Sequence, residues 1–162
     1  MLRGTLPATP STRLSEIVRG SLSGIAVICV AAAIMFSGNL YAEGDLTQRP
    51  QRLAELVMGS EESDYSLSEK TYELETGKAY RLEIVASGLK PYALRAPDFF
   101  SSVYLRKVEA GGMEIKALGL MELEFEDEGS AEIFFVPVKP GKFEFYIAGL
   151  RHKGMEGVFV VK

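Results

Sequence analysis

Residues 135 to 161 hold three short extended patterns joined by one tight turn and one glycine-rich loop, which restricts this end of the chain to β-structure. The turn is Pro140-Gly141, where proline presets φ for the first central position and glycine tolerates positive φ. Apolar and polar residues alternate after the turn, in the order Phe143, Glu144, Phe145, Tyr146 and Ile147. In an extended strand this alternation gives one apolar and one polar face. The sequence therefore predicts strands with one buried face.

The same alternation recurs earlier in the chain. Between 79 and 86, the apolar residues Tyr80, Leu82 and Ile84 are separated by charged residues. Further strand-like segments, bounded by glycine or proline, lie at 103–108, 118–125 and 131–136. The sequence has no long helical pattern and no internal repeat. These features predict an all-β fold, an antiparallel β-sandwich.

The first 42 residues have the composition of an export signal. Arg3, Arg13 and Arg19 make the beginning of the chain basic, and residues 21 to 42 contain no charged side chain. A basic start, an apolar stretch and a small residue before a cleavage point after Ala42 are typical of a secretory signal peptide. The uncharged stretch is also long enough for an anchor, since a membrane span needs about 20 residues. Both alternatives predict a periplasmic or otherwise exported domain, which contacts a membrane only if the segment stays uncleaved.

Residues 43–69 are mostly polar and are expected to form a linker before the folded domain. Within this segment, Pro50 precedes a short amphipathic patch in which Leu53, Leu56 and Val57 would share one face of a helix. The pattern predicts a short helix that packs against the domain, with a partner-binding helix as the alternative.

Charge and cysteine content narrow the classes of function. Removing residues 1–42 takes away three arginines and one glutamate, so the net charge changes from −4 to −6. An acidic exported domain is poorly suited to binding nucleic acid or anionic membrane surfaces. The only cysteine, Cys29, lies in the removed segment, so the mature domain has no disulfide and depends on its core. No nucleophile motif, phosphate loop or zinc-ligand spacing occurs, which argues against an enzyme.

The stretch from Pro140 to Val161 resembles the C-terminal signature of the cupredoxins, small β-sandwiches that hold one copper ion for electron transfer. It consists of a P-G-x-F-x-F strand, a loop carrying His152 and Met155, and a closing G-M-x-G-x-F-x-V strand. The resemblance implies a Greek-key β-sandwich with a metal-ligand loop between its last two strands.

Two further segments extend the resemblance over residues 70–162. The T-G-K-A-Y-R-L-E-I run at 76–84 is similar to the second strand of many cupredoxin-like domains. The A-P-D-F-F run at 96–100 is similar to cupredoxin-like domains of oxidase subunit II and of periplasmic iron-uptake proteins. Phe99 and Phe100 in this run are interpreted as core or lid aromatics rather than a binding platform.

The copper ligands of the family are only half present. A type-1 site needs a Cys thiolate, two His and a weak axial Met. His152 and Met155 occupy the loop positions, but Ile147 stands at the Cys position and the segment 89–94, where the other His belongs, has none. The resemblance therefore implies a cupredoxin-like sandwich without a type-1 copper centre, without a cofactor and not itself an electron carrier.

Two functional interpretations remain open. The first is a binding or accessory module in a periplasmic or membrane assembly for redox chemistry or metal uptake. The second is a copper- or iron-handling protein that binds metal through His152, Met155 and carboxylates, completed by Met113 or Tyr92. The acidic residues between 122 and 128 are candidates for the carboxylates, or else form a solvated strand face that discourages edge-to-edge aggregation.

Overall fold

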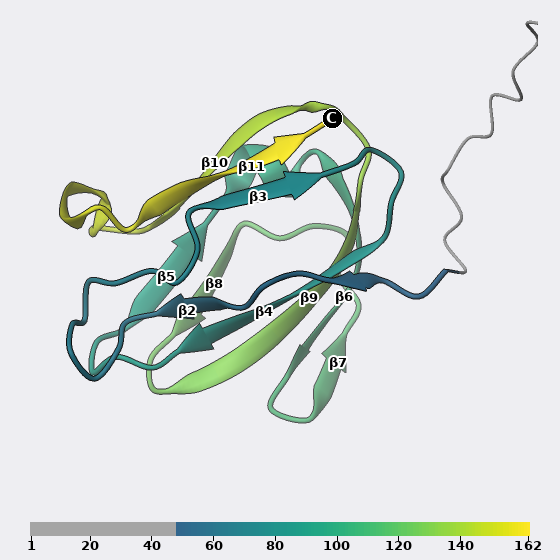
Figure 1. Cartoon of the computed structure of the whole chain (residues 1–162). Coiled ribbons are helices and arrows are strands. Elements are labelled where there is room, and N and C mark those ends of the chain that lie inside the picture. The colour runs from purple at the N-terminus through teal and green to yellow at the C-terminus, as the bar shows by residue number, and fades with distance from the viewer. Residues whose placement is uncertain (1–47) are drawn as a thin grey trace, which may run out of the picture. The chain divides into compact units, whose positions relative to one another are not determined.

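The computed structural model describes residues 48–162, which form two β-sheets packed face to face (Figure 1). The signal or anchor expected over residues 1–42 lies outside the described residues. The first sheet contains β1 (Gln51–Arg52), β2 (Leu56–Met58), β4 (Tyr80–Ala86), β6 (Val103–Ala110), β7 (Met113–Ile115) and β9 (Gly129–Pro137). The second contains β3 (Thr71–Leu74), β5 (Tyr92–Arg95), β8 (Glu122–Phe125), β10 (Gly141–Ile147) and β11 (Glu156–Val161). The predicted all-β sandwich is confirmed.

Strand pairing is mixed rather than purely antiparallel. The first sheet has the order β1-β4-β9-β6-β7 with β2 also beside β4, and the second has the order β3-β11-β10-β5-β8. The pairs β1/β4, β2/β4 and β3/β11 are parallel, and the other pairs are antiparallel. The three parallel partners come from the first part of the described chain, and each lies at an edge of its sheet, as Figure 1 shows for β2 and β3.

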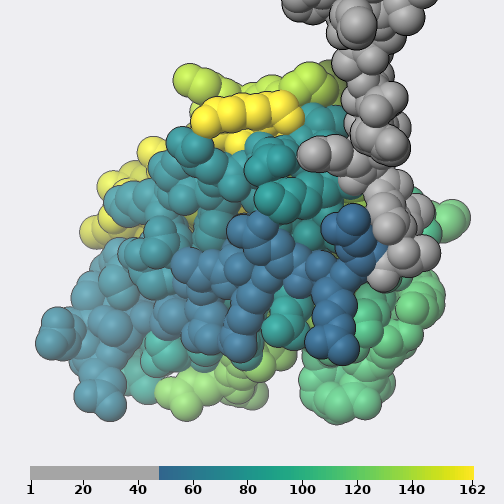
Figure 2. Space-filling view, turned by 45° about the vertical axis from the view of Figure 1, so that its right-hand side comes forward, coloured from purple at the N-terminus to yellow at the C-terminus, as the bar shows by residue number. Residues whose placement is uncertain are grey.

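The helix predicted after Pro50 is wrong, because this segment forms β1 and β2. Leu56 and Met58 are fully buried, and Val57 between them is partly exposed, so the burial follows the period of a strand. The Leu53 amide donates to the Arg81 carbonyl at 3.0 Å. Pairing with β4 supplies the hydrogen bonds, and tertiary contacts of this kind override weak local helix preference. The segment from Gln51 to Met58 therefore belongs to the first sheet and is not a linker (Figure 2).

The core lies between the sheets and is rich in aromatic rings. The alternation predicted for β4 and β10 is confirmed, with Tyr80, Leu82 and Ile84 buried in one sheet and Phe143, Phe145 and Ile147 buried in the other. The short helix α2 (Pro97–Phe100) brings Phe99 into this core, where its ring stacks on that of Phe159 at 3.9 Å between centroids. Phe99 and Phe100 are both buried, so their interpretation as core aromatics is confirmed.

The acidic residues Glu122 and Glu124 lie on the edge strand β8, and Glu126, Asp127 and Glu128 lie in the bend after it. The strand expected over 118–125 begins only at Glu122, because the chain first crosses from the first sheet to the second, and Met121 is exposed. In β8, Glu124 is exposed and Glu122 forms an ion pair with Arg95 of the neighbouring strand. Charged side chains on an edge strand oppose pairing with another chain, which fits the solvated-face interpretation.

Within residues 48–162, no helix has the length and apolar character that crossing a membrane requires.

Candidate functional site

The loop between β10 and β11 carries the two candidate metal ligands. It runs from Ala148 to Met155 and contains a single 3-10 turn, η1 (Arg151–Lys153). Gly149 and Gly154 have φ values of +73° and +81°, in the left-handed region where side chains are disfavoured. These two glycines let the loop reverse direction within a few residues. The Ile147 amide donates to the Met155 carbonyl at 3.0 Å and closes its base.

The base of the loop, where the resemblance places the copper Cys, is apolar and fully buried. Ile147 and Met155 are both 0 % exposed, and Leu94, the register partner of Ile147 on β5, is 1 % exposed. Leu150 packs against the same core cluster. Hydrocarbon side chains offer no donor atom to a metal, and Met155 offers only a thioether. These residues therefore do not fit a type-1 copper ion.

His152 is not part of this apolar base. It is exposed, and its side chain makes no hydrogen bond or ion pair with any residue in the range 48–162. The two neighbouring residues, Arg151 and Lys153, do contact other side chains. Arg151 pairs with Glu144 at 2.7 Å and with Glu156 at 2.9 Å, and Lys153 Nζ lies 5.3 Å from the centre of the Tyr65 ring. The two loop candidates thus differ in environment, with His152 in solvent and Met155 in the core.

The residues expected to complete a metal site with His152 and Met155 have other positions. Tyr92 is buried and its hydroxyl donates to the Asp64 carbonyl at 3.0 Å, while burial raises its pKa. Met113 lies on β7 in the other sheet and is exposed. Among residues 48–162, no three His, Cys, Asp or Glu side chains gather closely enough to hold a metal ion.

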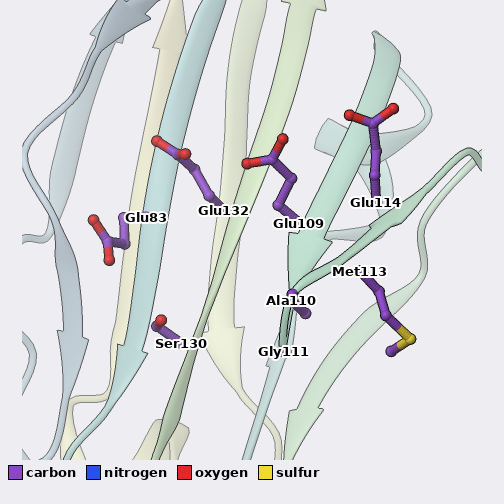
Figure 3. A pocket seen from close by; sticks show the side chains of 9 residues that line it. Glu83, Glu109, Ala110, Gly111, Met113, Glu114, Ser130 and Glu132 are labelled. Carbon is purple, nitrogen blue, oxygen red and sulfur yellow. The ribbon is translucent and has the colours of Figure 1, made fainter.

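A row of four glutamates on the first sheet could not be found from the sequence. Glu83 on β4 is opposite Glu132 on β9, which is opposite Glu109 on β6, and Glu109 is opposite Glu114 on β7. The four side chains lie next to one another across the strands and line a shallow hollow of about 380 Å³ (Figure 3). Each is an ordinary charged residue of a solvent-facing strand position, and only the strand register brings them together.

Each glutamate of the row already has a basic partner. Glu83 pairs with Arg52 at 2.7 Å, and Glu132 pairs with Arg81 at 3.5 Å. Lys107 pairs with both Glu109 and Glu114, and Lys116 pairs with Glu114 at 2.7 Å. Like charges directly opposite each other on adjacent strands are destabilising, and these cations offset that cost.

The strongest electrostatic effect in the row is at Glu114. Hydrogen bonds from Lys116 and Lys107 lower its pKa to about 2. Hydrogen bonds to Glu109 and Glu114 raise the pKa of Lys107 in turn. The row is therefore a set of ion pairs between the protein's own side chains.

The chain matches no protein-family model and no curated protein. Solved structures do match. A multicopper oxidase variant from the hyperthermophile Aquifex aeolicus matches with a TM-score of 0.55 at 12 % identity, over 73 % of this chain and 31 % of that chain. A multicopper oxidase from Campylobacter jejuni gives 0.50 at 13 % identity, over 72 % and 31 %. A laccase from Pediococcus acidilactici gives 0.51 at 10 % identity, over 74 % and 28 %.

The likeness concerns the fold, because all three identities are low. This chain spans about a third of the length of those oxidases. Their shared architecture agrees with the motifs at residues 96–100 and 140–161 and with the two packed sheets described above. The chain has a cupredoxin-like fold, an all-β sandwich of two mixed sheets.

Proposed function

We propose that this chain is an exported binding or accessory module with a cupredoxin-like fold, which does not itself carry electrons. The observation that supports this most strongly is the replacement at the base of the β10–β11 loop. Ile147 stands where a copper thiolate is needed, and it is buried against Leu94 rather than against a histidine. Without the thiolate and the second imidazole, a site has neither the geometry nor the selectivity of a type-1 centre.

The location and partner of the module are part of the same proposal. The basic and apolar character of residues 1–42 supports export to the periplasm or beyond, with membrane attachment if the segment is retained. The partner is then a periplasmic or membrane assembly that carries out redox chemistry or metal uptake, and the module is not an enzyme. The acidic net charge argues against nucleic acid as a ligand.

The alternative function is copper or iron handling through His152, Met155 and carboxylates. The exposure of His152 favours this alternative, because its imidazole is accessible to a metal ion and has no competing partner in the range 48–162. The burial of Met155 argues against it, since the sulfur reaches solvent only if the loop opens. Neutral imidazole is a good ligand for copper, but selective binding needs further donors.

Titration calorimetry of the full chain separates the two functions. Cu(I), Cu(II) and Fe(III) are each added in the presence of a competing chelator, to the Cys29→Ser variant, so that the single thiol does not contribute. The accessory function predicts no heat above the chelator background. One site of sub-micromolar affinity that is lost in His152→Ala and kept in Lys153→Ala would instead establish metal handling.

A further inference from the structure

Backbone hydrogen bonds connect the residues at the base of the β10–β11 loop. The Leu150 amide donates to the Ile147 carbonyl at 3.0 Å, and the Ile147 amide donates to the Met155 carbonyl at 3.0 Å. The side chains of these three residues belong to or pack against the buried core, as does Leu94, which faces Ile147 across the strand pair. We name the four residues Leu94, Ile147, Leu150 and Met155 the apolar latch.

Two residues of the loop, Arg151 and Lys153, also contact side chains outside the loop. The Arg151 guanidinium lies 4.7 Å from the centre of the Tyr146 ring and bridges Glu144 and Glu156, one residue on each of the two strands that the loop joins. Lys153 Nζ lies over the ring of Tyr65, which precedes β3. His152 therefore stands between two anchored neighbours, on a turn whose base is apolar.

We propose that the apolar latch replaces a metal ion as the element that closes this loop. A copper site would join the end of β10, β5 and the loop through metal–ligand bonds, and here burial of hydrocarbon joins the same three segments. Met155 then acts as a hydrophobic anchor, and its sulfur is not needed. The latch predicts that the loop stays closed when no metal is bound.

This inference does not depend on the proposed function. A metal ion at His152 would leave the latch intact, and a metal-free accessory module could still have an open loop. Failure of the latch and failure of the accessory role are therefore distinguishable, because the first is read from the loop backbone and the second from metal binding.

Hydrogen exchange of the full chain tests the latch. The reporters are the amides of Leu150, Lys153 and Gly154, which donate to the carbonyls of Ile147, Leu150 and Arg151 respectively. The reference is the β4–β9 ladder around Leu82. Met155→Leu keeps the volume and removes the sulfur, so the latch predicts loop exchange within about twofold of wild type. Met155→Ala leaves a cavity and predicts loop exchange faster by about tenfold or more. The cavity also lowers the free energy of global unfolding, so the reference amides measure that loss, and Met155→Leu is the matched control.

The wild-type protein provides a second measurement that does not depend on a variant folding. With a chelator present, the three loop amides are expected to be protected, and addition of Cu(I) is expected to change their exchange by less than about twofold. Loop amides that exchange freely under chelator and slow by about tenfold or more with Cu(I) would overturn the proposal. So would a loss of protection in Met155→Leu, because the sulfur would then be required.

Discussion

The apolar latch and the glutamate row are the two regions of this protein that invite comparison as metal sites, and they differ in the donor atoms they offer. The latch lies at the base of the loop that carries His152, and Leu94 and Ile147 have no donor atoms there. The glutamate row has four carboxylates on neighbouring strands, yet each is paired with arginine or lysine. The latch has only the buried thioether of Met155 as a donor, and in the glutamate row the protein's own cations already pair with the carboxylates.

This difference shows that the place of a site in the fold does not decide whether its side chains can bind a metal ion. Hydrophobic packing and surface ion pairs both stabilise a sandwich without any ligand, although by different amounts. Burial of a large apolar side chain contributes roughly 1.5–3 kcal/mol, whereas an exposed ion pair contributes about 0–1 kcal/mol. Perturbing the latch should therefore change stability more than perturbing the row.

The largest effect is expected from truncating Ile147. Ile147→Ala leaves a cavity in a fully buried region, so it should lower the free energy of unfolding by about 2–5 kcal/mol. Ile147→Val, which removes a single methylene, should cost about 0.5–1.5 kcal/mol. Urea denaturation measures both, and equal costs for the two variants would contradict tight packing of the latch.

Gly157 should also be sensitive, because a side chain at this position has no space. A Cβ there would lie 2.4 Å from the Phe145 ring and 2.5 Å from the Lys70 carbonyl oxygen. Gly157→Ala should therefore cost about 1–3 kcal/mol, as overpacking usually does. Gly129→Ala is the matched control, since a Cβ at Gly129 meets nothing within 4 Å. Thermal unfolding that shifts equally in both variants would refute the packing argument.

The glutamate row predicts a pH dependence of stability. The pKa of Glu114 is about 2 in the folded protein, below its ordinary value of 4.5, so its ion pairs stabilise the fold above pH 4.5. This contribution is lost as the pH falls from 4.5 towards 2. The midpoint of urea unfolding should drop less over that range in Glu114→Gln than in wild type, and an equal drop in both proteins would speak against the Lys107 and Lys116 contacts.

The smallest effect is expected from His152. The side chain is exposed and has no hydrogen-bond or ion-pair partner in residues 48–162, so His152→Ala should change the free energy of unfolding by less than about 0.5 kcal/mol. Denaturation with and without a chelator measures this. A clear destabilisation that appears only without chelator would show that His152 binds a metal in the folded state.

Local patterns were enough to predict much of the fold. The alternation in β4 and β10 predicted the strands and their buried faces, because it depends on neighbouring residues only. The turn expected at Pro140-Gly141 is instead a connection between the two sheets, in which Gly141 already belongs to β10. The absence of a cysteine at position 147 was also visible in the sequence, since a motif of fixed spacing shows which residue type stands at each position.

Features that depend on pairing between distant segments were not predictable. Leu56 and Met58 fit a helix and a strand equally well over three residues, and only the position of β4 decides for the strand. The glutamate row requires the register of four strands. The burial of Met155 and the exposure of His152, three residues apart on one loop, follow from how the loop folds back on the core.

The most direct test of the account is the visible absorption spectrum of the wild-type full chain with added Cu(II). A type-1 centre gives an intense thiolate-to-copper band, which needs a Cys at the end of β10, where Ile147 stands. The account predicts that no such band appears at any copper concentration. An intense band that saturates at one copper per chain would contradict it.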